Sequence, residues 1–555
     1  MYVRLSRKKI HDTSYEYLQL CEAYRNAKGQ PCTRVLTNFG RIDKFDRKKI
    51  DSAIDALLKF SSFPSAARFG DAQYGRVMDC GDILAVIHLW ARLRLTESIL
   101  ASLQENRAEF DIAKMIQVMV LNRVSDPLSK LGVMRWLQTA YISDLKADEV
   151  QYQHLLRAMD YLSEAKDELE KRLYNELVSL FSPDVDIIFY DLTSCYFEGE
   201  GPELAHYGYS RDHRPDRKQL VLALVVTREG LPIYHEVMPG NTSDVATLEG
   251  VAKVLSSRFN IRKVIFVCDR GMISRENLEK LEELEFPYII GLRLRNNQEA
   301  RSLYQKSLSG FKPDESLNGL MVKEKQKGDY RFIQCHNPAV AEEKKANREK
   351  RLKKVEDRIK SLERLFERKQ ISAEDLYHKV ASVLEEQRLS KFFRPKIQSG
   401  KIILYMDTEV LREESYLDGK FFLKTNVKAE VLPAVEVVKS YKQLQEVERS
   451  FRELKDFLKI RPIFHYNDER VKAHVFICVL AYLFEKLIEL QCRRASLRYS
   501  GRRALSLLSQ FKAIECKVAG QSVTVTNRVD EEIRSIMDAI GFSIPFQTFE
   551  NANKV

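Results

Sequence analysis

The chain has 555 residues, with 90 lysines and arginines against 79 aspartates and glutamates. The resulting net charge of +11 and the pI near 9.0 favour a polyanionic partner such as nucleic acid. The length excludes a small disulfide-stapled fold, and the nine cysteines contain no C-x-x-C pair, which argues against a structural zinc site. The longest apolar run, 475–484, is about half of the ~20 residues that cross a bilayer, and no apolar stretch follows the basic N-terminus, so we expect a cytoplasmic protein without a membrane partner.

The predicted elements fall into blocks along the chain. Two apolar-rich runs around the turn residues 26–29 predict a β-hairpin within 1–45. Apolar residues at helical spacing predict a helical bundle over 46–180. Over 181–290, short strands followed by alternating helices predict an α/β layer with a partly parallel sheet.

The second half of the chain interrupts this order. Residues 291–430 contain strand-like pieces around a charged segment, in which the apolar residues from Leu352 to Phe366 are spaced by three and four. This spacing predicts a short coiled coil or a helical hairpin. A last helical stretch is expected over 431–490, and a C-terminal region with an arginine cluster fills 491–555.

Two aspartates stand out because each directly follows a run of strand-forming residues. Asp191 follows the run at 187–190, and Asp269 follows the run at 264–268. Reactive groups in open α/β sheets gather beyond the carboxyl ends of strands, so neighbouring strands would bring these two carboxylates together. The alternative is that both are ordinary turn residues, since aspartate is common at strand ends.

A third carboxylate lies in the helix predicted around 441–455. At about 100° per residue, a step of seven residues returns to nearly the same face, so Tyr441, Glu448 and Lys455 line one stripe. Arg452 lies beside this stripe. The combination is unusual for a purely solvated helix, although a surface ladder that pairs Glu448 with Arg452 is an equal alternative.

Three converging carboxylates need a cation. Two unit charges ~4 Å apart repel by on the order of 4 kcal/mol at an effective dielectric of about 20. Mg²⁺ and Mn²⁺ prefer carboxylate oxygen, and two such ions can activate the attacking oxygen and stabilise the leaving oxygen of a displacement at phosphorus. The trio therefore indicates phosphodiester hydrolysis or strand transfer.

These residues resemble those of the DDE transposases of bacterial insertion sequences, in the branch with a Tyr-Arg-Glu-Lys signature on the last catalytic helix. The resemblance is carried by Tyr-Asp-Leu-Thr at 190–193, Gly-Asn-Thr-Ser-Asp at 240–244, Cys-Asp-Arg-Gly-Met at 268–272, and the helix that contains Glu448. The gaps of the signature place Tyr441, Leu444, Glu448 and Lys455 in register. Leu444 occupies the position of the signature's arginine.

The resemblance implies roles for these residues. The metal ligands would be Asp191, Asp269 and Glu448, which would hold two Mg²⁺ ions per site, with Mn²⁺ as the alternative ion. Tyr441 and Lys455 would hold DNA phosphates near the cleavage point. Leucine at 444 cannot bind a phosphate as the signature's arginine would, so Arg449 or Arg452 would take that role.

The resemblance also implies the fold and the partners. The fold would be an α/β, ribonuclease H-like catalytic core interrupted by an insertion domain, with a helical N-terminal DNA-binding region. The core would occupy 181–290 and 431–490, with the insertion at 291–430. The enzyme would cleave at the ends of its element and join the 3′ hydroxyl to target DNA. Its partners would be double-stranded DNA, with the terminal inverted repeats as the specific site, and a second copy of the chain. The two copies would form a dimer on DNA in the nucleoid.

Two other functions remain open from the sequence. One is a DNA-binding repressor of the element with a decayed active site, and the other is a nuclease without joining activity. Whether excision passes through a hairpin also stays open.

Overall fold

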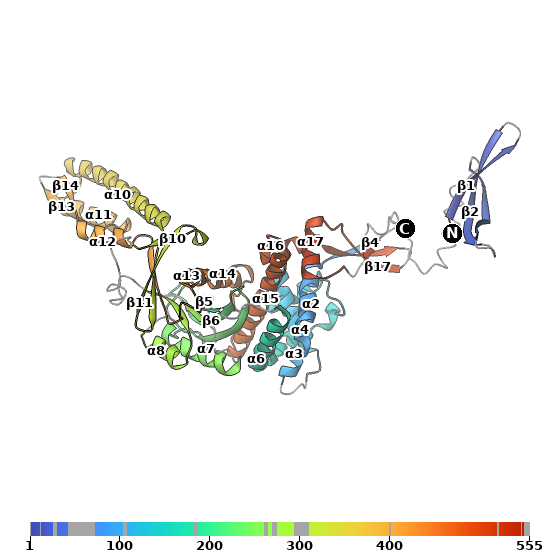
Figure 1. Ribbon diagram of the computed structural model, residues 1–555, viewed down its shortest axis with the longest axis horizontal. Helices are drawn as coiled ribbons and strands as arrows, with labels where there is room; N and C mark the ends of the chain where they lie inside the picture. Colours follow the sequence, from blue (N-terminus) through green and yellow to red (C-terminus); the bar gives the residue numbers. More distant parts are fainter. Residues whose placement is uncertain are drawn as a thin grey trace. The chain divides into compact units, whose positions relative to one another are not determined.

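The computed structural model describes residues 2–10, 13–25, 30–42, 73–103, 108–181, 187–259, 265–268, 275–292, 310–398, 401–518, 521–544 and 547–548. The chain divides into two compact units (Figure 1). The smaller unit comprises Met1–Arg76, Ile514–Thr526 and Phe546–Val555, and the larger comprises Val77–Ala513 and Asn527–Pro545. Among the described helices, none combines the length and the apolar composition that a membrane span requires.

The N-terminal residues form a three-stranded antiparallel sheet of β1 (Tyr2–Ile10), β2 (Thr13–Arg25) and β3 (Pro31–Arg41). The pairing of β2 with β3 matches the predicted hairpin, and its turn residues 26–29 lie outside the described residues. The third strand, β1, pairs with β2 along its whole length.

A second sheet joins distant parts of the sequence. Its order is β18 (Gln547–Thr548), β17 (Gln521–Thr526), β16 (Lys512–Val518) and β4 (Gln73–Asp79). β4 lies within 46–180, for which the sequence pattern predicts only helices. Its partner β16 is more than 400 residues away, so no local pattern reports the pairing.

The largest sheet has nine strands, in the order β10-β11-β12-β15-β9-β8-β5-β6-β7. The bounds are β5 (Ile187–Tyr196), β6 (Gln219–Thr227), β7 (Pro232–Pro239), β8 (Ile265–Cys268), β9 (Tyr288–Leu292), β10 (Lys312–Asp314), β11 (Leu320–Lys327), β12 (Tyr330–His336) and β15 (Lys420–Thr425). β5, β6 and β7 form an antiparallel meander, whereas β8 pairs in parallel with both β5 and β9. The predicted partly parallel α/β sheet is therefore present.

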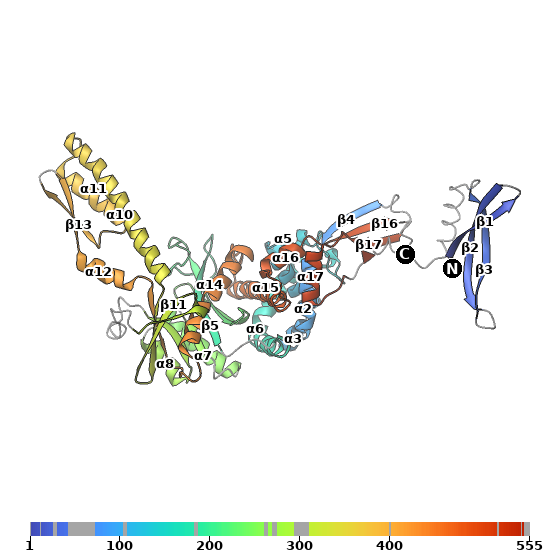
Figure 2. The same cartoon turned by 45° about the horizontal axis from the view of Figure 1, so that its top comes forward.

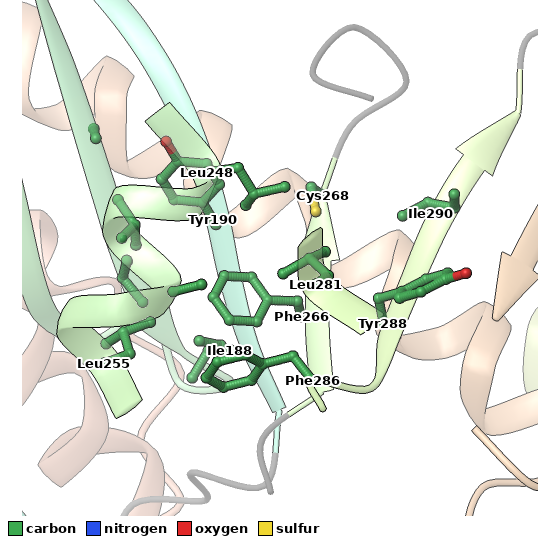
Figure 3. Close-up of a cluster of buried hydrophobic side chains, with 14 of the residues drawn as sticks. Ile188, Tyr190, Leu248, Leu255, Phe266, Cys268, Leu281, Phe286, Tyr288 and Ile290 are labelled. Atoms are coloured by element: carbon green, nitrogen blue, oxygen red, sulfur yellow. The ribbon is translucent and has the colours of Figure 1, made fainter. Parts of the chain in front are cut away.

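The two faces of β5 have different environments. Its side chains alternate between the faces, as in any strand. Ile188, Tyr190 and Leu192 belong to a buried cluster with residues of α7 (Asp244–Arg258) and α8 (Arg275–Glu283) (Figure 3). Asp191 and Thr193 therefore project to the opposite face. That face is covered by α14 (Gln445–Arg452), which packs against β5 and β6.

Helices form the other large part of the unit. They are α2 (Gly81–Arg92), α3 (Leu95–Ser102), α4 (Ile112–Ser125), α5 (Lys130–Trp136), the 3₁₀ turn η3 (Ala147–Glu149), α6 (Tyr152–Phe181), α15 (Asp468–Arg494), α16 (Gly501–Leu508) and α17 (Glu531–Ile540). α15 is buried along nearly all of its length, and it packs against α4, α6 and β7. The apolar run at 475–484 thus forms a core helix shared by the helical bundle and the sheet.

The charged segment of the sequence forms a helical hairpin, which is one of the two structures that the spacing predicts (Figure 2). α10 (Pro338–Glu367) packs on α11 (Ala373–Glu386) through an apolar seam that includes Val355, Ile359 and Leu362. The hairpin is followed by β13 (Phe393–Gln398), β14 (Lys401–Met406) and α12 (Thr408–Leu417), and η4 (Glu315–Leu317) precedes it. β12 and β15, which flank this segment in the sequence, are neighbours in the large sheet.

Gly240, which follows β7, is enclosed by main-chain carbonyl groups. A Cβ atom at this position would lie 1.9 Å from the carbonyl oxygen of Gln219 and 2.4 Å from that of His206. Neither oxygen can move without disturbing the β-bridge between those two residues. We expect Gly240→Ala to lower the free energy of unfolding by roughly 2–3 kcal/mol, measured by denaturant unfolding, because overpacked sites typically cost 1–3 kcal/mol.

Gly250→Ala provides a matched control. Gly250 is exposed in α7, and a Cβ atom there meets nothing within 4 Å. The higher helix propensity of alanine predicts no loss, and up to about 1 kcal/mol of added stability. Similar losses for the two variants would contradict the packing argument at Gly240.

Candidate active site

Asp191 lies in the middle of β5, so the prediction that it follows the end of a strand is wrong. β5 continues to Tyr196 because its pairing with β6 runs from Ile188↔Thr227 to Tyr196↔Gln219, well beyond the apolar run that the sequence displays. Asp191 is half-buried, and its Oδ1 accepts a hydrogen bond of 2.8 Å from the main-chain N–H of Leu192.

Asp269 lies outside the described residues. It follows Cys268, the last residue of β8. β8 lies beside β5 in parallel, with Ile187 opposite Ile265 and Phe189 opposite Val267. The strands that lead towards Asp191 and towards Asp269 are thus neighbours that run in the same direction.

The helix predicted around 441–455 is not continuous. α13 (Ala434–Gln443) ends before Leu444, α14 carries Glu448, and Glu453–Phe457 form a π-helical turn, η5. The i→i+5 hydrogen bonds of a π-helical turn widen it, so a regular 100° step does not hold across this segment. The prediction of one uninterrupted stripe is therefore wrong.

The ends of the predicted stripe lie in different surroundings. The ring of Tyr441 stacks on Phe421 of β15, with centroids 6.1 Å apart. Lys455 instead reaches β5, where its Nζ donates a hydrogen bond of 2.7 Å to Oγ1 of Thr193. Thr193 is two residues from Asp191 and projects from the same face of the strand.

The remaining predicted residues lie on α14. Glu448 and Arg452 are exposed. Arg449 is half-buried, with Nη2 3.5 Å from Oε2 of Glu489 on α15. Nearby Glu489 and Glu446 outweigh burial and raise the pKa of Arg449 above its ordinary value, so it stays charged. No cluster of three metal-ligating side chains occurs among the described residues, which do not include Asp269.

Asp212 is a residue of this site that the sequence did not reveal. Its Oδ1 accepts a hydrogen bond of 2.9 Å from Lys455, and its Oδ2 lies 3.0 Å from Nη1 of Arg461. All three side chains are largely buried, so the carboxylate balances two cations and fixes Lys455 beside β5. The partners are more than 240 residues apart in the sequence, and no motif marks Asp212.

Cys195, two residues beyond Thr193, shares this face of β5. Its side chain is fully buried, and burial raises the pKa of the thiol to about 11. It is therefore a neutral thiol at neutral pH. The groups that this face can offer to a cation are hydroxyl and carboxylate oxygens.

The larger unit thus has a mixed α/β sheet, and one face of β5 carries Asp191 and contacts Lys455. Residues 183–484, more than half of the chain, match the transposase DDE domain family, and residues 3–67 match the N-terminal domain of IS1634 family transposases. The chain belongs to the DDE transposases of bacterial insertion sequences. It is a DNA-cleaving and strand-transferring enzyme, and enzymes of this family use divalent metal ions.

Two solved structures are similar to parts of the chain. One is a cryo-EM structure of the piggyBac transposase synaptic complex with hairpin DNA, at 12% identity, with 77% of this chain and 79% of that chain covered and a TM-score of 0.38. The other is the Mos1 transposase paired-end complex with left transposon end, at 15% identity, with 33% and 60% covered and a TM-score of 0.15. No curated protein matches the chain.

Proposed function

We propose that Asp191, Asp269 and Glu448 are the catalytic carboxylates of a ribonuclease H-like core. The observation that carries this proposal is that α14, which bears Glu448, packs on the face of β5 from which Asp191 projects. The parallel pairing of β5 with β8, directly before Asp269, supports it as well. So does the sheet order β7-β6-β5-β8-β9, an antiparallel meander followed by two parallel strands.

The donors of this site fit a hard divalent cation. Asp191 and Glu448 offer carboxylate oxygen, and the neighbouring Cys195 remains a protonated thiol, so the set suits Mg²⁺ or Mn²⁺ better than a softer metal. We assign two ions to the site. When bound, such ions supply an activated attacking oxygen and stabilise charge on the leaving oxygen.

Cations around the carboxylates would hold the DNA backbone. Lys455 is fixed by Thr193 and Asp212, and this leaves little side-chain entropy to lose when a phosphate oxygen approaches. Arg452 is exposed one turn after Glu448 and can reach a neighbouring phosphate. We assign more peripheral phosphate contacts to Arg449 and Tyr441.

The assignment of Lys455 predicts a loss of activity in Lys455→Met, which keeps the apolar stem and removes the ammonium group. We expect the initial rate of DNA cleavage to fall roughly 10- to 100-fold, because a hydrogen bond to a charged group contributes about 1.5–3 kcal/mol. Lys472→Met is the control, since Lys472 pairs with Glu469 on α15 and touches none of the site residues. A wild-type rate in Lys455→Met would reject the phosphate role.

The flanking parts of the chain have proposed roles in DNA recognition. We assign binding of the terminal inverted repeats to the helical region within 46–180, the role of an insertion domain to 291–430, and the active form to a nucleoid-associated dimer on DNA. An incubation of the full chain with Mg²⁺ and DNA carrying the inverted repeats that bracket its gene tests the whole proposal. Cleaved ends joined to target DNA are expected, whereas a repressor would shift the DNA without cutting it and a nuclease would cut without joining.

A further inference from the structure

The helix that carries Glu448 packs on α15 through polar side chains. Ser450 of α14 shares a hydrogen bond of 2.6 Å with the hydroxyl group of Tyr482 on α15. One turn earlier on α14, Oε2 of Glu446 lies 3.8 Å from Nζ of Lys486, which is one turn later on α15. The residue numbers rise along one helix where they fall along the other, so α14 and α15 run antiparallel at this interface.

A second row of side chains follows from the antiparallel register. It begins where Nη2 of Arg449 lies 3.5 Å from Oε2 of Glu489. Four residues, about one helical turn, lead from Arg449 to Glu453, the first residue of η5. The opposite step on α15 leads from Glu489 to Glu485. The register therefore places Glu453 opposite Glu485, in agreement with the packing of η5 on α15. At this position the row pairs two acids instead of an acid with a base.

Each carboxyl group of this pair has an oxygen that no described residue satisfies. Glu485 is 1% exposed, and its Oε2 is buried without a hydrogen-bond partner. Oε2 of Glu453 is also buried without a partner. Two ionised carboxylates at this position would repel each other, and both would lack a hydrogen-bond donor. One proton removes both costs, because a protonated carboxyl group donates a hydrogen bond to a carboxylate.

The two cations nearest to the pair are already matched by other acids. Nζ of Lys486 lies 3.3 Å from Glu489 and 3.8 Å from Glu446. The guanidinium of Arg449 lies 3.5 Å and 3.9 Å from the same two acids. Further charged or titratable groups on the elements packed here are Tyr482 and Arg493 of α15, Arg502 of α16, and Arg228 and Glu229 of the turn after β6.

Burial and the neighbouring carboxylate favour a proton on Glu485. Burial first, and then the charge of Glu453, raise the pKa of Glu485 to about 8, although Lys486 acts in the opposite direction. The pair of carboxyl groups therefore keeps a proton at neutral pH.

We propose that Glu453 and Glu485 share one proton and that this proton holds η5 against α15. η5 also carries Lys455, whose Nζ donates to Thr193 on the face of β5 that presents Asp191. Glu485 is thus a positioning residue for Lys455. Loss of the proton sets two buried carboxylates against each other, and their repulsion pushes η5 away from α15. The inference rests on the proposed function in one respect, since the role of Lys455 in DNA cleavage belongs to that proposal.

The shared proton is tested by denaturant unfolding of the full chain between pH 5 and 9. Glu485→Gln is always neutral and can donate to Glu453, so it imitates the protonated pair. The folded wild type keeps a proton that the unfolded chain releases above about pH 4.5, so its stability falls as the pH rises to about 8 and then levels off. The unfolding equilibrium constant of the wild type, divided by that of Glu485→Gln, should therefore rise by up to about tenfold per pH unit between pH 5 and 8.

Two further variants complete the unfolding experiment. Glu453→Gln removes the repulsion from the other side, so it should also flatten the pH dependence, and it replaces Glu485→Gln if that variant does not fold. Glu469→Gln is the matched control on α15. Glu469 is exposed, and its hydrogen bond from Lys472 lowers its pKa, so this variant should keep the pH dependence of the wild type. Parallel pH dependence of the wild type and Glu485→Gln overturns the shared proton.

The positioning role is tested by the initial rate of DNA cleavage with Mg²⁺ over the same pH range. The rate of Glu485→Gln divided by that of the wild type should stay near one at pH 7 and rise at least about threefold by pH 9, because only the wild type loses the shared proton. A ratio that stays constant, or falls, would reject the positioning role even if the unfolding data support the proton. Because unfolding needs neither DNA nor metal, its failure is distinct from a failure of the proposed catalytic site.

Discussion

Asp191→Asn is expected to abolish DNA cleavage and strand transfer while DNA binding stays near the wild-type level. Asparagine keeps the size of the side chain and can still accept the hydrogen bond from the N–H of Leu192. It removes the negative charge that a divalent cation requires. We expect a loss of at least about 1,000-fold, which corresponds to roughly 4 kcal/mol of transition-state stabilisation. Cleavage assays with Mg²⁺ and electrophoretic mobility shifts on the same DNA measure the two effects separately.

Asp216→Asn is the matched control for this variant. Asp216 forms a bidentate pair with Arg214 in an exposed loop, and the hydrogen bond from Arg214 lowers its pKa to about 2. The pair is exposed and lies outside the proposed site, so the rate of cleavage should change less than about threefold. Glu448→Gln should behave as Asp191→Asn does, and the double variant should lose little more, because residues that act as one unit are not additive. Cleavage by Asp191→Asn at the rate of Asp216→Asn would remove the basis of the proposed site.

The parts of the fold that the sequence predicted are those with a strong local pattern. The apolar runs of β5, β6 and β8 are continuous because both faces of the sheet are buried there, and such runs indicate strands. The seam from Leu352 to Phe366 predicted a short coiled coil or a helical hairpin, and in the hairpin one helix buries that stripe against the next. In both cases the pattern of apolar residues that indicates burial lies within one short stretch of the sequence.

The parts that the sequence did not predict depend on distant partners. Asp191 lies within β5 because β6 continues the ladder past it, and the apolar run alone ends at Tyr190. Lys455 contacts β5 because a π-helical turn changes the direction of its side chain and Asp212 holds it there. A helical wheel assumes a regular helix, so it shows neither the π-helical turn nor the contact between Lys455 and Asp212.

Glu170→Gln is expected to destabilise the larger unit by about 3–5 kcal/mol, the usual cost of removing one member of a buried ion pair. Glu170 on α6 is 4% exposed and accepts hydrogen bonds from Lys166 at 3.0 Å and from the ring of His235, on β7, at 2.7 Å. Glutamine removes the nearest carboxylate of Lys166, whose Nζ then retains, among the described residues, only Asp167 and Glu236, each 3.7 Å away. Glu168→Gln, which affects an exposed pair with Arg172 on the same helix, should change stability by less than about 0.5 kcal/mol. Denaturant unfolding at pH 7 measures both variants.

The pH dependence of the stability lost in Glu170→Gln tests whether the charge on Glu170 is the cause of the loss. Burial alone would raise the pKa of Glu170, but Lys166 and His235 outweigh it and hold the pKa below the ordinary value of 4.5. A carboxylate with a depressed pKa stabilises the fold fully above the unfolded-state pKa and loses this contribution as the pH falls through the folded-state pKa. The difference in the free energy of unfolding between wild type and Glu170→Gln should therefore be constant from pH 6 to 7 and shrink below about pH 4.5. A gap that stays the same in acid would mean that glutamine disturbs packing between α6 and β7 instead of removing a charge.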